Sequence, residues 1–223
     1  MCRSWHRRCG LGAAGFVPGR LEIFTFDDRC ISGRVTGSVF LGDLMDTPNI
    51  ITTDLGGTSF DVGVIHNGAP IVTYKSLVRQ YEYFLPKVDV HTLGTGGGSK
   101  VRVDKITRSL RVGPDSAGAD PGPVCYGKGG TVPTTTDADL VLGYLDANNY
   151  AGGTIKLDRA AAAAALQILA DEIGMGLYEF ASGVATIAEF QMADLIRKMT
   201  VTKGLDPREF VVYAFGGAGP VHM

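Results

Sequence analysis

The chain has few cysteines and lacks any long apolar run. Its 223 residues include 4 cysteines, and these show none of the paired spacings of a zinc ribbon or a redox motif: Cys2, Cys9, Cys30 and Cys125. This usage fits a reduced, cytoplasmic compartment. No stretch reaches the roughly 18 consecutive apolar residues of a membrane-spanning helix, so a soluble protein without a membrane partner is predicted.

An excess of basic charge is also missing. The chain carries 21 Lys and Arg against 23 Asp and Glu, a formal net charge of -2. Nothing therefore indicates a nucleic acid or an anionic membrane surface as partner, and a small-molecule substrate is expected. Arginines near the N-terminus precede a short apolar stretch, but this stretch is too short for the core of a signal peptide.

Glycine is the residue in excess, with 31 positions, about twice the average usage of roughly 7%. We predict residues 1–30 to be irregular, because they show no sustained periodicity. Alternating or β-rich runs predict strands, and 3.6-residue periodicity or alanine-rich composition predicts helices. The strands are expected at 50–53, 60–65, 70–74, 88–93, 100–104 and 210–215, and the helices at 140–142, 159–173 and 178–202. A long loop is expected over 113–136. This order predicts an α/β fold with mixed sheets and covering helices.

The first glycine loop, residues 54–61, lies between two predicted strands. It combines a carboxylate, bare backbone N–H groups and two hydroxyls, in the order Asp54, Gly56, Gly57, Thr58, Ser59 and Asp61. Such a loop can approach phosphate oxygens closely, and a carboxylate at a strand end can position magnesium. No lysine follows the glycines, so it is not a Walker loop. The alternative is a plain hairpin turn.

A second glycine loop follows the predicted strand 210–215. Its residues are Gly216, Gly217, Ala218 and Gly219, followed by Pro220. This composition suits close approach by an adenosine or a phosphate, with a helix N-terminus expected just beyond. The sequence stops three residues after Pro220, which favours a domain cut at its C-terminal end.

Three further features have open interpretations. Asp89 and His91 lie on one face of a predicted strand, where a metal or an acid–base pair competes with a simple hydrogen-bonded histidine. The run Gly96–Gly98 indicates either an anion nest or close packing of two backbones. Cys125 has no neighbouring histidine or lysine to activate it, so a buried apolar role is expected.

Four segments in order resemble the hydantoinase A/oxoprolinase family: TDLGGTSFDV at 53–62, DVHTLGTGGGS at 89–99, GPDSAGADPGP at 113–123, and 206–220, which begins DPREF and ends GP. The resemblance runs from about Ile31 to the end, with a domain 31–223 truncated at both ends. It implies an actin-like, ribonuclease-H-like ATPase fold. Arg34 and Thr36 depart from it, since they stand where proline and glycine are usual. No earlier D-x-G-G-T loop precedes Asp54, although the family has one.

The resemblance also implies a function. Family members are ATP-dependent hydrolases of cyclic amides, of the hydantoin or 5-oxoproline type, or ATP-binding subunits of ketone carboxylases, and they activate a substrate oxygen by phosphorylation. It implies ATP and Mg²⁺, with Asp54 as the magnesium-positioning residue, and Asp61 in an orienting role. Thr58 and Ser59 would contact phosphate, and 216–219 would form the adenosine loop. A B-type subunit is the implied partner.

Two alternatives remain open from the sequence. A small-molecule kinase could use the same fold, although the long loop at 113–123 gives it no support. The chain could also be a catalytically incomplete fragment or an interaction subunit, because part of the expected nucleotide cleft is missing.

Overall fold

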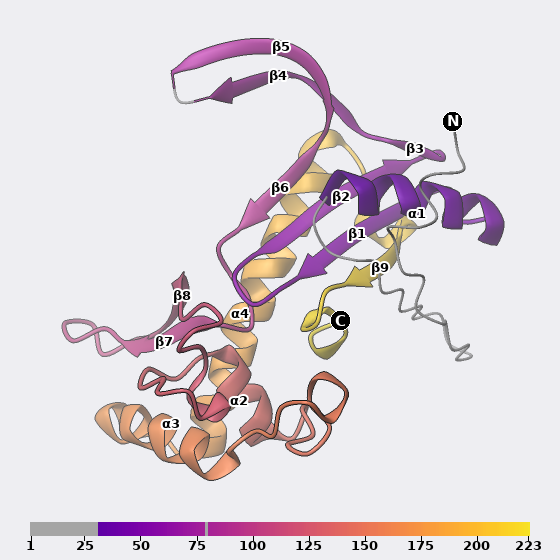
Figure 1. Ribbon diagram of the computed structural model, residues 1–223. Coiled ribbons are helices and arrows are strands. Elements are labelled where there is room, and N and C mark those ends of the chain that lie inside the picture. The colour runs from indigo at the N-terminus through magenta and orange to yellow at the C-terminus, as the bar shows by residue number, and fades with distance from the viewer. Residues whose placement is uncertain (1–30, 79) are drawn as a thin grey trace. The chain divides into compact units, whose positions relative to one another are not determined.

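The computed structural model describes residues 31–78 and 80–223 (Figure 1). The segment 1–30, expected to be irregular, lies outside the described residues. The chain divides into two compact units, each of which is treated separately below. Among the described residues, the sheet unit comprises 31–54, 61–92 and 194–220, and the helical unit comprises 55–60, 93–193 and 221–223.

The sheet unit is built on one mixed sheet. Its strand order is β3-β2-β1-β9, with β6 also paired to β2. The strands are β1 (Ile50–Leu55), β2 (Phe60–His66), β3 (Ala69–Pro70), β6 (Val90–Leu93) and β9 (Val211–Phe215). β1 runs parallel to β9, whereas β2 and β3 form an antiparallel hairpin whose turn residues Asn67 and Gly68 both have positive φ. The mixed α/β character predicted from the sequence is confirmed.

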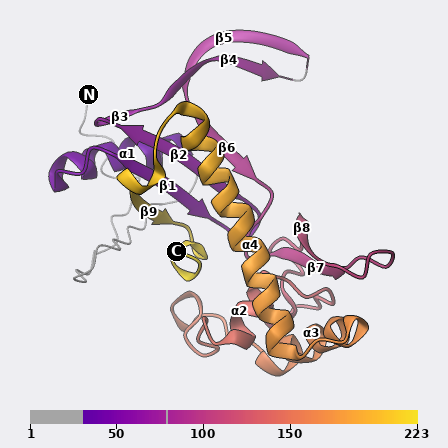
Figure 2. The same ribbon diagram turned by 180° about the vertical axis from the view of Figure 1, so that it is seen from behind.

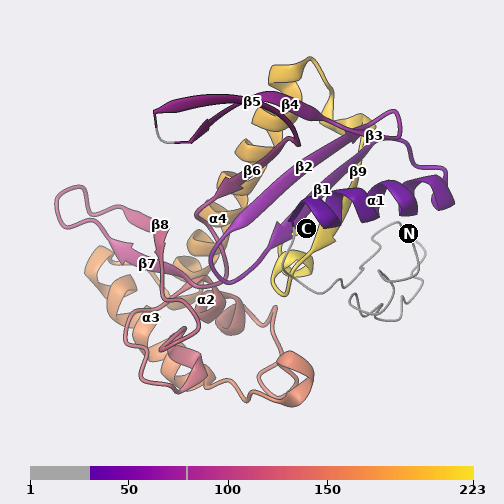
Figure 3. The same cartoon turned by 45° about the horizontal axis from the view of Figure 1, so that its top comes forward.

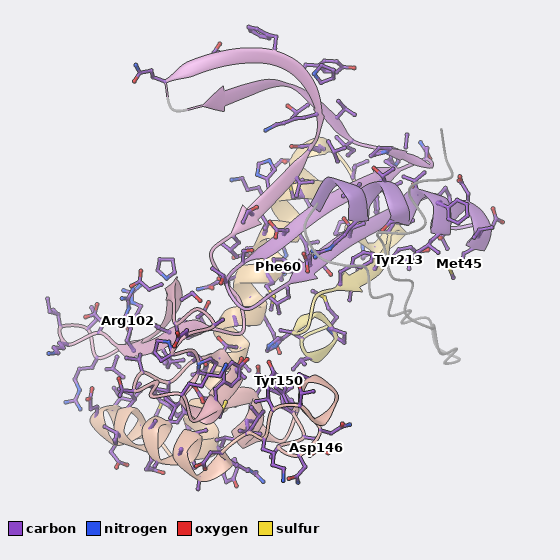
Figure 4. All side chains as sticks on the ribbon, in the orientation of Figure 1. Met45, Phe60, Arg102, Asp146, Tyr150 and Tyr213 are labelled. Carbon is purple, nitrogen blue, oxygen red and sulfur yellow. The ribbon has the colours of Figure 1, made fainter. Side chains whose placement is uncertain are left out.

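The core of the sheet unit lies between the sheet and helix α1 (Ile31–Met45). Its buried residues are Val35, Ile50, Ile65, Tyr213 and Phe215, each at most 2% exposed. Figure 3 shows α1 lying along the sheet, and Figure 4 shows Tyr213 and Met45 on neighbouring elements. The Tyr213 hydroxyl is 2.9 Å from Thr47 Oγ1 and 3.6 Å from the Met45 sulfur. The sequence analysis did not predict this helix.

An antiparallel arm extends the sheet unit beyond its core. It consists of β4 (Val72–Val78) and β5 (Tyr81–Val88), which pair with each other. Tyr74 and Phe84 are 66% and 71% exposed. The predicted strand at 70–74 covers only the start of β4, and β5 was not predicted before position 88. Both strands were hard to predict because the side chains of this segment do not alternate between an apolar and a polar face.

The helical unit combines a hairpin with helices. The hairpin pairs β7 (Ser99–Val103) with β8 (Leu110–Ser116). Its helices are α2 (Thr135–Leu142), α3 (Arg159–Ile173) and residues 177–193 of α4 (Leu177–Thr200). The loop prediction for 113–136 was wrong at its start, because β8 continues through Pro114 to Ser116. Proline is compatible with an edge strand.

The helices begin and end as their sequences indicate. The Asp158 side chain accepts a hydrogen bond from the Ala161 amide and caps α3, and Gly174 ends it in a left-handed conformation. The buried stripe of α3 consists of Ala162, Leu166 and Ala170. Along the N-terminal part of α4, Phe180, Val184 and Met192 are buried, at spacings that keep one face toward the core. Figure 2 shows α3 and α4 from behind.

Short 3₁₀ turns complete the described structure: η1 (Val124–Tyr126), η2 (Ala151–Gly153), η3 (Val201–Lys203), η4 (Pro207–Glu209) and η5 (Gly219–Val221). Within residues 31–78 and 80–223, no single helix has the length and apolarity to cross a membrane, although the bent pair of α3 with Leu177–Lys203 passes the same test of length and composition.

Candidate functional site

Two strands of the sheet unit end side by side where the glycine loops begin. In the parallel pair of β1 and β9, Asp54 lies opposite Phe215. The carboxyl ends of neighbouring parallel strands are where α/β proteins bind ligands, because the loops that leave them start at one edge. The sequence therefore placed both loops correctly at strand ends.

Asp54 forms an ion pair with Arg34 of α1. The two side chains are 14% and 11% exposed, so this charge pair is largely shielded from water. Ion pairs of this kind are held more strongly than surface pairs because solvent screens them less. The sequence analysis noted Arg34 only as a departure from the family pattern, and missed it as the partner of Asp54.

This ion pair bears on the predicted magnesium. Mg²⁺ needs carboxylate or water oxygens with free lone pairs, and usually takes one or two carboxylates together with substrate phosphates. Here a guanidinium already neutralises Asp54, and no group of three or more His, Cys, Asp or Glu side chains suited to a metal occurs in the part of the chain that the structure describes. An ion bound directly by Asp54 does not fit this arrangement. Magnesium held near Asp54 through water stays a prediction.

Asp61, at the start of β2, is 5% exposed. Its carboxylate accepts a short hydrogen bond from the Thr92 hydroxyl of β6. Thr92 thus fixes the orientation of the Asp61 carboxylate. The role predicted for Asp61, to orient a reacting group, is consistent with this contact and stays a prediction.

The second glycine loop is exposed where it leaves β9. Gly216 and Gly217 are exposed, and Gly216 has φ of 87°, a conformation that favours glycine. A Cβ on Gly219 would lie 3.8 Å from the carbonyl carbon of Ala214, which is ordinary contact. The chain then forms the 3₁₀ turn η5. The predicted adenosine role of Gly216 to Gly219 is not tested by this geometry and stays a prediction.

Residues 55–59 of the first glycine loop, named the phosphate loop after the role predicted for it from the sequence, belong to the helical unit. Its amide at Gly56 donates to the Ser59 carbonyl at 3.0 Å, which closes a tight turn. Gly57 and Thr58 are exposed, and their amides donate no hydrogen bond to any residue that the structure describes. Free amides on an exposed glycine turn are the donors that phosphate oxygens require.

A second segment, residues 94–99, holds this loop through backbone hydrogen bonds and is called the glycine clamp. The amides of Gly97 and Gly98 donate to the carbonyls of Gly56 and Gly57 at 3.0 and 2.7 Å. The clamp in turn is held by Thr136 of α2, whose amide and hydroxyl both donate to the Gly97 carbonyl at 2.8 Å. The carbonyls of the phosphate loop therefore point into the protein.

The clamp requires glycine at two positions. A Cβ on Gly96 would lie 2.7 Å from the Gly56 carbonyl oxygen, and one on Gly98 would lie 2.7 Å from that of Gly57. Residues 95–99 are buried. Of the two interpretations left open by the sequence, the structure favours close backbone packing over an accessible anion nest.

The remaining sequence candidates have structural roles. In the sheet unit, Asp89 lies 2.7 Å from Lys203 Nζ and 3.4 Å from His91 Nε2. His91 is 44% exposed, and the described residues around it do not form a metal-binding group, so the hydrogen-bonded alternative stays a prediction. In the helical unit, the Cys125 side chain is fully buried, and burial together with the neighbouring Asp137 raises the pKa of its thiol. Cys125 is therefore a poor nucleophile, as expected.

The helical unit also contains an ionisable cluster that the sequence did not indicate. His222 Nε2 lies 3.3 Å from Asp139 Oδ2, and His222 Nδ1 lies 3.4 Å from Glu189 Oε1. The side chains of His222 and Asp139 are 0% and 2% exposed. Three segments far apart in sequence contribute these residues, so no local pattern could indicate the cluster.

A match to a family model decides the classification. Residues 29–223 match the model described as Hydantoinase/oxoprolinase. The chain belongs to the hydantoinase/oxoprolinase family. The resemblance inferred from the four ordered segments is thereby confirmed.

Among its relatives is the acetophenone carboxylase gamma subunit of Aromatoleum aromaticum, 38% identical over 201 residues, which cover 89% of this chain and 27% of that protein. Two solved structures are also similar. One is the nucleotide-free acetone carboxylase from a study of ATP-dependent acetone carboxylation, with TM-score 0.79 and 38% identity, covering 86% of this chain and 27% of that one. The other is the ATP-dependent caprolactamase of Pseudomonas jessenii, with TM-score 0.74 and 40% identity, covering 82% and 27%. The chain thus spans about a quarter of the length of these relatives.

Proposed function

We propose that this chain contributes to nucleotide binding in an ATP-dependent enzyme that activates the oxygen of a small amide or ketone by phosphorylation. The observation that carries the proposal is the phosphate loop, whose exposed Gly57 and Thr58 amides donate to no described residue while its carbonyls are held by the glycine clamp. Support comes from two relatives whose structures are described as ATP-dependent, one acting on caprolactam and one carboxylating acetone.

In this proposal each segment has a distinct part. The amides of Gly57 and Thr58 and the hydroxyls of Thr58 and Ser59 bind phosphate oxygens, whereas residues 216–219 lie against the adenosine. Asp54 and Asp61 orient the reacting groups. Phosphoryl transfer needs little covalent chemistry from the protein, so positioning and charge neutralisation make up most of its contribution. The fold would be the actin-like ATPase fold, and a B-type subunit would be the partner.

The Asp54→Ala variant tests the assignment of the loop. We expect it to lose magnesium-dependent ATP binding, measured by calorimetry in a full-length relative that carries the change at the matching position, while the change that matches Asp194→Ala on the exposed surface of α4 keeps it. Unchanged ATP affinity in Asp54→Ala would remove Asp54 from the nucleotide site.

Product analysis separates the two reactions. With ATP and a lactam, an amide hydrolase yields a ring-opened amino acid, ADP and phosphate. With ATP, bicarbonate and a ketone, a carboxylase yields a keto acid. A stable phosphorylated product instead would indicate a kinase and contradict both.

A further inference from the structure

Asp139 and His222, which are buried, form an ionisable cluster with the exposed Glu189, and this cluster has no evident structural task. Its neighbour Asp137 shows what a structural aspartate does in this unit. That carboxylate accepts hydrogen bonds from the amides of Val124, Cys125 and Thr134 and from the Thr134 hydroxyl, at 2.7 to 3.2 Å. Asp137 thereby caps α2 and fixes η1, whereas the Asp139 carboxylate accepts no hydrogen bond from a backbone amide within residues 31–78 and 80–223.

Instead, three buried polar atoms around Asp139 lack hydrogen-bond partners among the described residues. They are Asp139 Oδ1, His222 Nε2 and Thr135 Oγ1. His222 Nε2 is 3.3 Å from Asp139 Oδ2, but the two atoms are not aligned as a hydrogen bond. Thr135 and Asp139 are four residues apart on α2 and therefore lie on one face of the helix. Unpaired buried polar atoms cost roughly 1–3 kcal/mol each, so their retention points to a functional use.

Helix α2 connects this cluster to the phosphate loop. Thr136, three residues before Asp139, donates two hydrogen bonds to the Gly97 carbonyl, and the Gly97 amide donates to Gly56. All of these residues belong to the helical unit. The same helix therefore supports the phosphate loop and carries the buried carboxylate one turn later.

The electrostatics suit proton transfer. Burial raises the pKa of Asp139, and the nearby His222 only partly offsets this. Burial lowers the pKa of His222, but contact with Asp139 and Glu189 outweighs it, so the net shift is upward. The other ionisable groups facing the pair are Asp137 on α2 and the Cys125 thiol on η1. Glu189, 44% exposed, connects His222 to solvent.

We propose that Asp139 and His222 form the proton-transfer pair of the same active site, with Glu189 as the residue that orients His222. This inference rests on the proposed function, because both candidate reactions need a proton to move. General acid–base groups of this type contribute about 10² to 10⁴ in rate.

For a cyclic amide the step balances without any redox change. ATP transfers its γ-phosphoryl group to the amide oxygen and leaves as ADP. One water then bonds through its oxygen to the amide carbon and passes one proton to the pair. The C–N bond breaks as the pair returns that proton to the departing nitrogen, and the remaining hydroxyl proton is released as the acyl phosphate forms. A second water cleaves the acyl phosphate to a carboxylate and phosphate. For a ketone, the pair would instead take the proton from the carbon next to the carbonyl when the enol phosphate forms.

Two measurements test the pair. In the 223-residue chain, histidine-resolved NMR titration should give His222 a pKa above the ordinary value of about 6.5, and Asp139→Asn should lower it. In the full-length protein with its partner subunit, Asp139→Asn and His222→Gln should lower kcat about 100-fold or more and remove one limb of the pH–rate profile. ATP affinity should stay within about twofold of the wild-type value. This is well below a tenfold change, which corresponds to about 1.4 kcal/mol. Asp194→Asn, an exposed aspartate on α4, is the matched control.

The outcomes are distinguishable. An active wild-type enzyme whose pH–rate profile is unchanged in both variants would overturn the proton-transfer pair alone. A wild-type enzyme that turns over neither lactam nor ketone with ATP would contradict the proposed function, and the pair would fall with it. If Asp139→Asn neither folds nor binds ATP, and its kcat stays low at every pH, the cluster has a structural role instead.

Discussion

The Arg34–Asp54 ion pair sets the charge at the carboxyl edge of the sheet. A guanidinium always carries its charge, so it neutralises Asp54 at every physiological pH. A nucleotide binding near Asp54 would therefore meet a neutral pair and not a bare carboxylate. Any nucleotide role of Asp54 therefore depends on Arg34 as well.

Removing the guanidinium should change the dependence on magnesium. In Arg34→Ala, the Asp54 carboxylate loses its guanidinium partner and can interact with a cation. We therefore expect ATP binding to depend more steeply on the Mg²⁺ concentration than in the wild type. Calorimetry over a magnesium series measures this. Arg197→Ala, which removes an exposed arginine paired with Asp194, serves as control and should leave the dependence unchanged. An identical magnesium dependence in Arg34→Ala would show that the ion pair does not compete with the metal.

The Asp139–His222 pair should make stability depend on pH. Both folded-state pKa values are raised, so the folded protein binds more protons than the unfolded chain. Stability is then complete below the unfolded values, and falls from about pH 4 upward for Asp139 and from about pH 6.5 upward for His222. Denaturant unfolding across pH 4 to 9 should show this decline. His222→Gln should flatten the upper part, and a wild-type profile rising with pH above about 6.5 would contradict the assignment.

The amino-acid sequence predicted some of the candidate site residues but not the residues that contact them. Asp54 and the glycines were found because a strand followed by glycines is a local pattern. Their partners were not, since Arg34 reaches Asp54 from a helix 20 residues earlier and His222 reaches Asp139 across 83 residues. Such contacts depend on the fold, which a local pattern does not specify.

The glycine clamp is the element that shapes the phosphate loop. It joins α2 to the loop through backbone hydrogen bonds, which no side-chain pattern specifies. The same limit explains the elements that were missed. Helix α3 was predicted to the residue because its cap and alanines are local signals, whereas α1 contains three glycines and two β-branched valines that disfavour a helix in isolation.

Closing the space in the clamp should weaken nucleotide binding. In Gly98→Ala the new methyl group would meet the Gly57 carbonyl oxygen at 2.7 Å, so the loop must shift. Overpacking of this kind costs about 1–3 kcal/mol, and we expect ATP affinity to fall about tenfold or more. Gly176→Ala, where a Cβ meets nothing within 4 Å, is the matched control. Equal ATP affinity in the two variants would mean that the clamp does not position the loop.

At the scale of the whole molecule, the candidate residues are divided between two units with separate cores. The sheet unit contains Asp54, Asp61 and residues 216–219, and the helical unit contains the phosphate loop, its clamp and the proton-transfer pair. The chain spans about a quarter of the length of its solved relatives. Sequence patterns identified the family but could not show this division, because it depends on which segments pack together.

This division predicts how the chain binds nucleotide by itself. A phosphate loop that offers two free amides and an exposed second loop should bind Mg–ATP weakly, because few donors converge on the phosphates. We expect calorimetry to give the 223-residue chain a Kd at least tenfold above that of a full-length protein, a difference of about 1.4 kcal/mol. Gly98→Ala in the same chain should abolish the residual binding if it occurs through this loop. Full affinity in the short chain would show instead that the two glycine loops suffice for a complete nucleotide site, and residual binding that survives Gly98→Ala would place the nucleotide elsewhere.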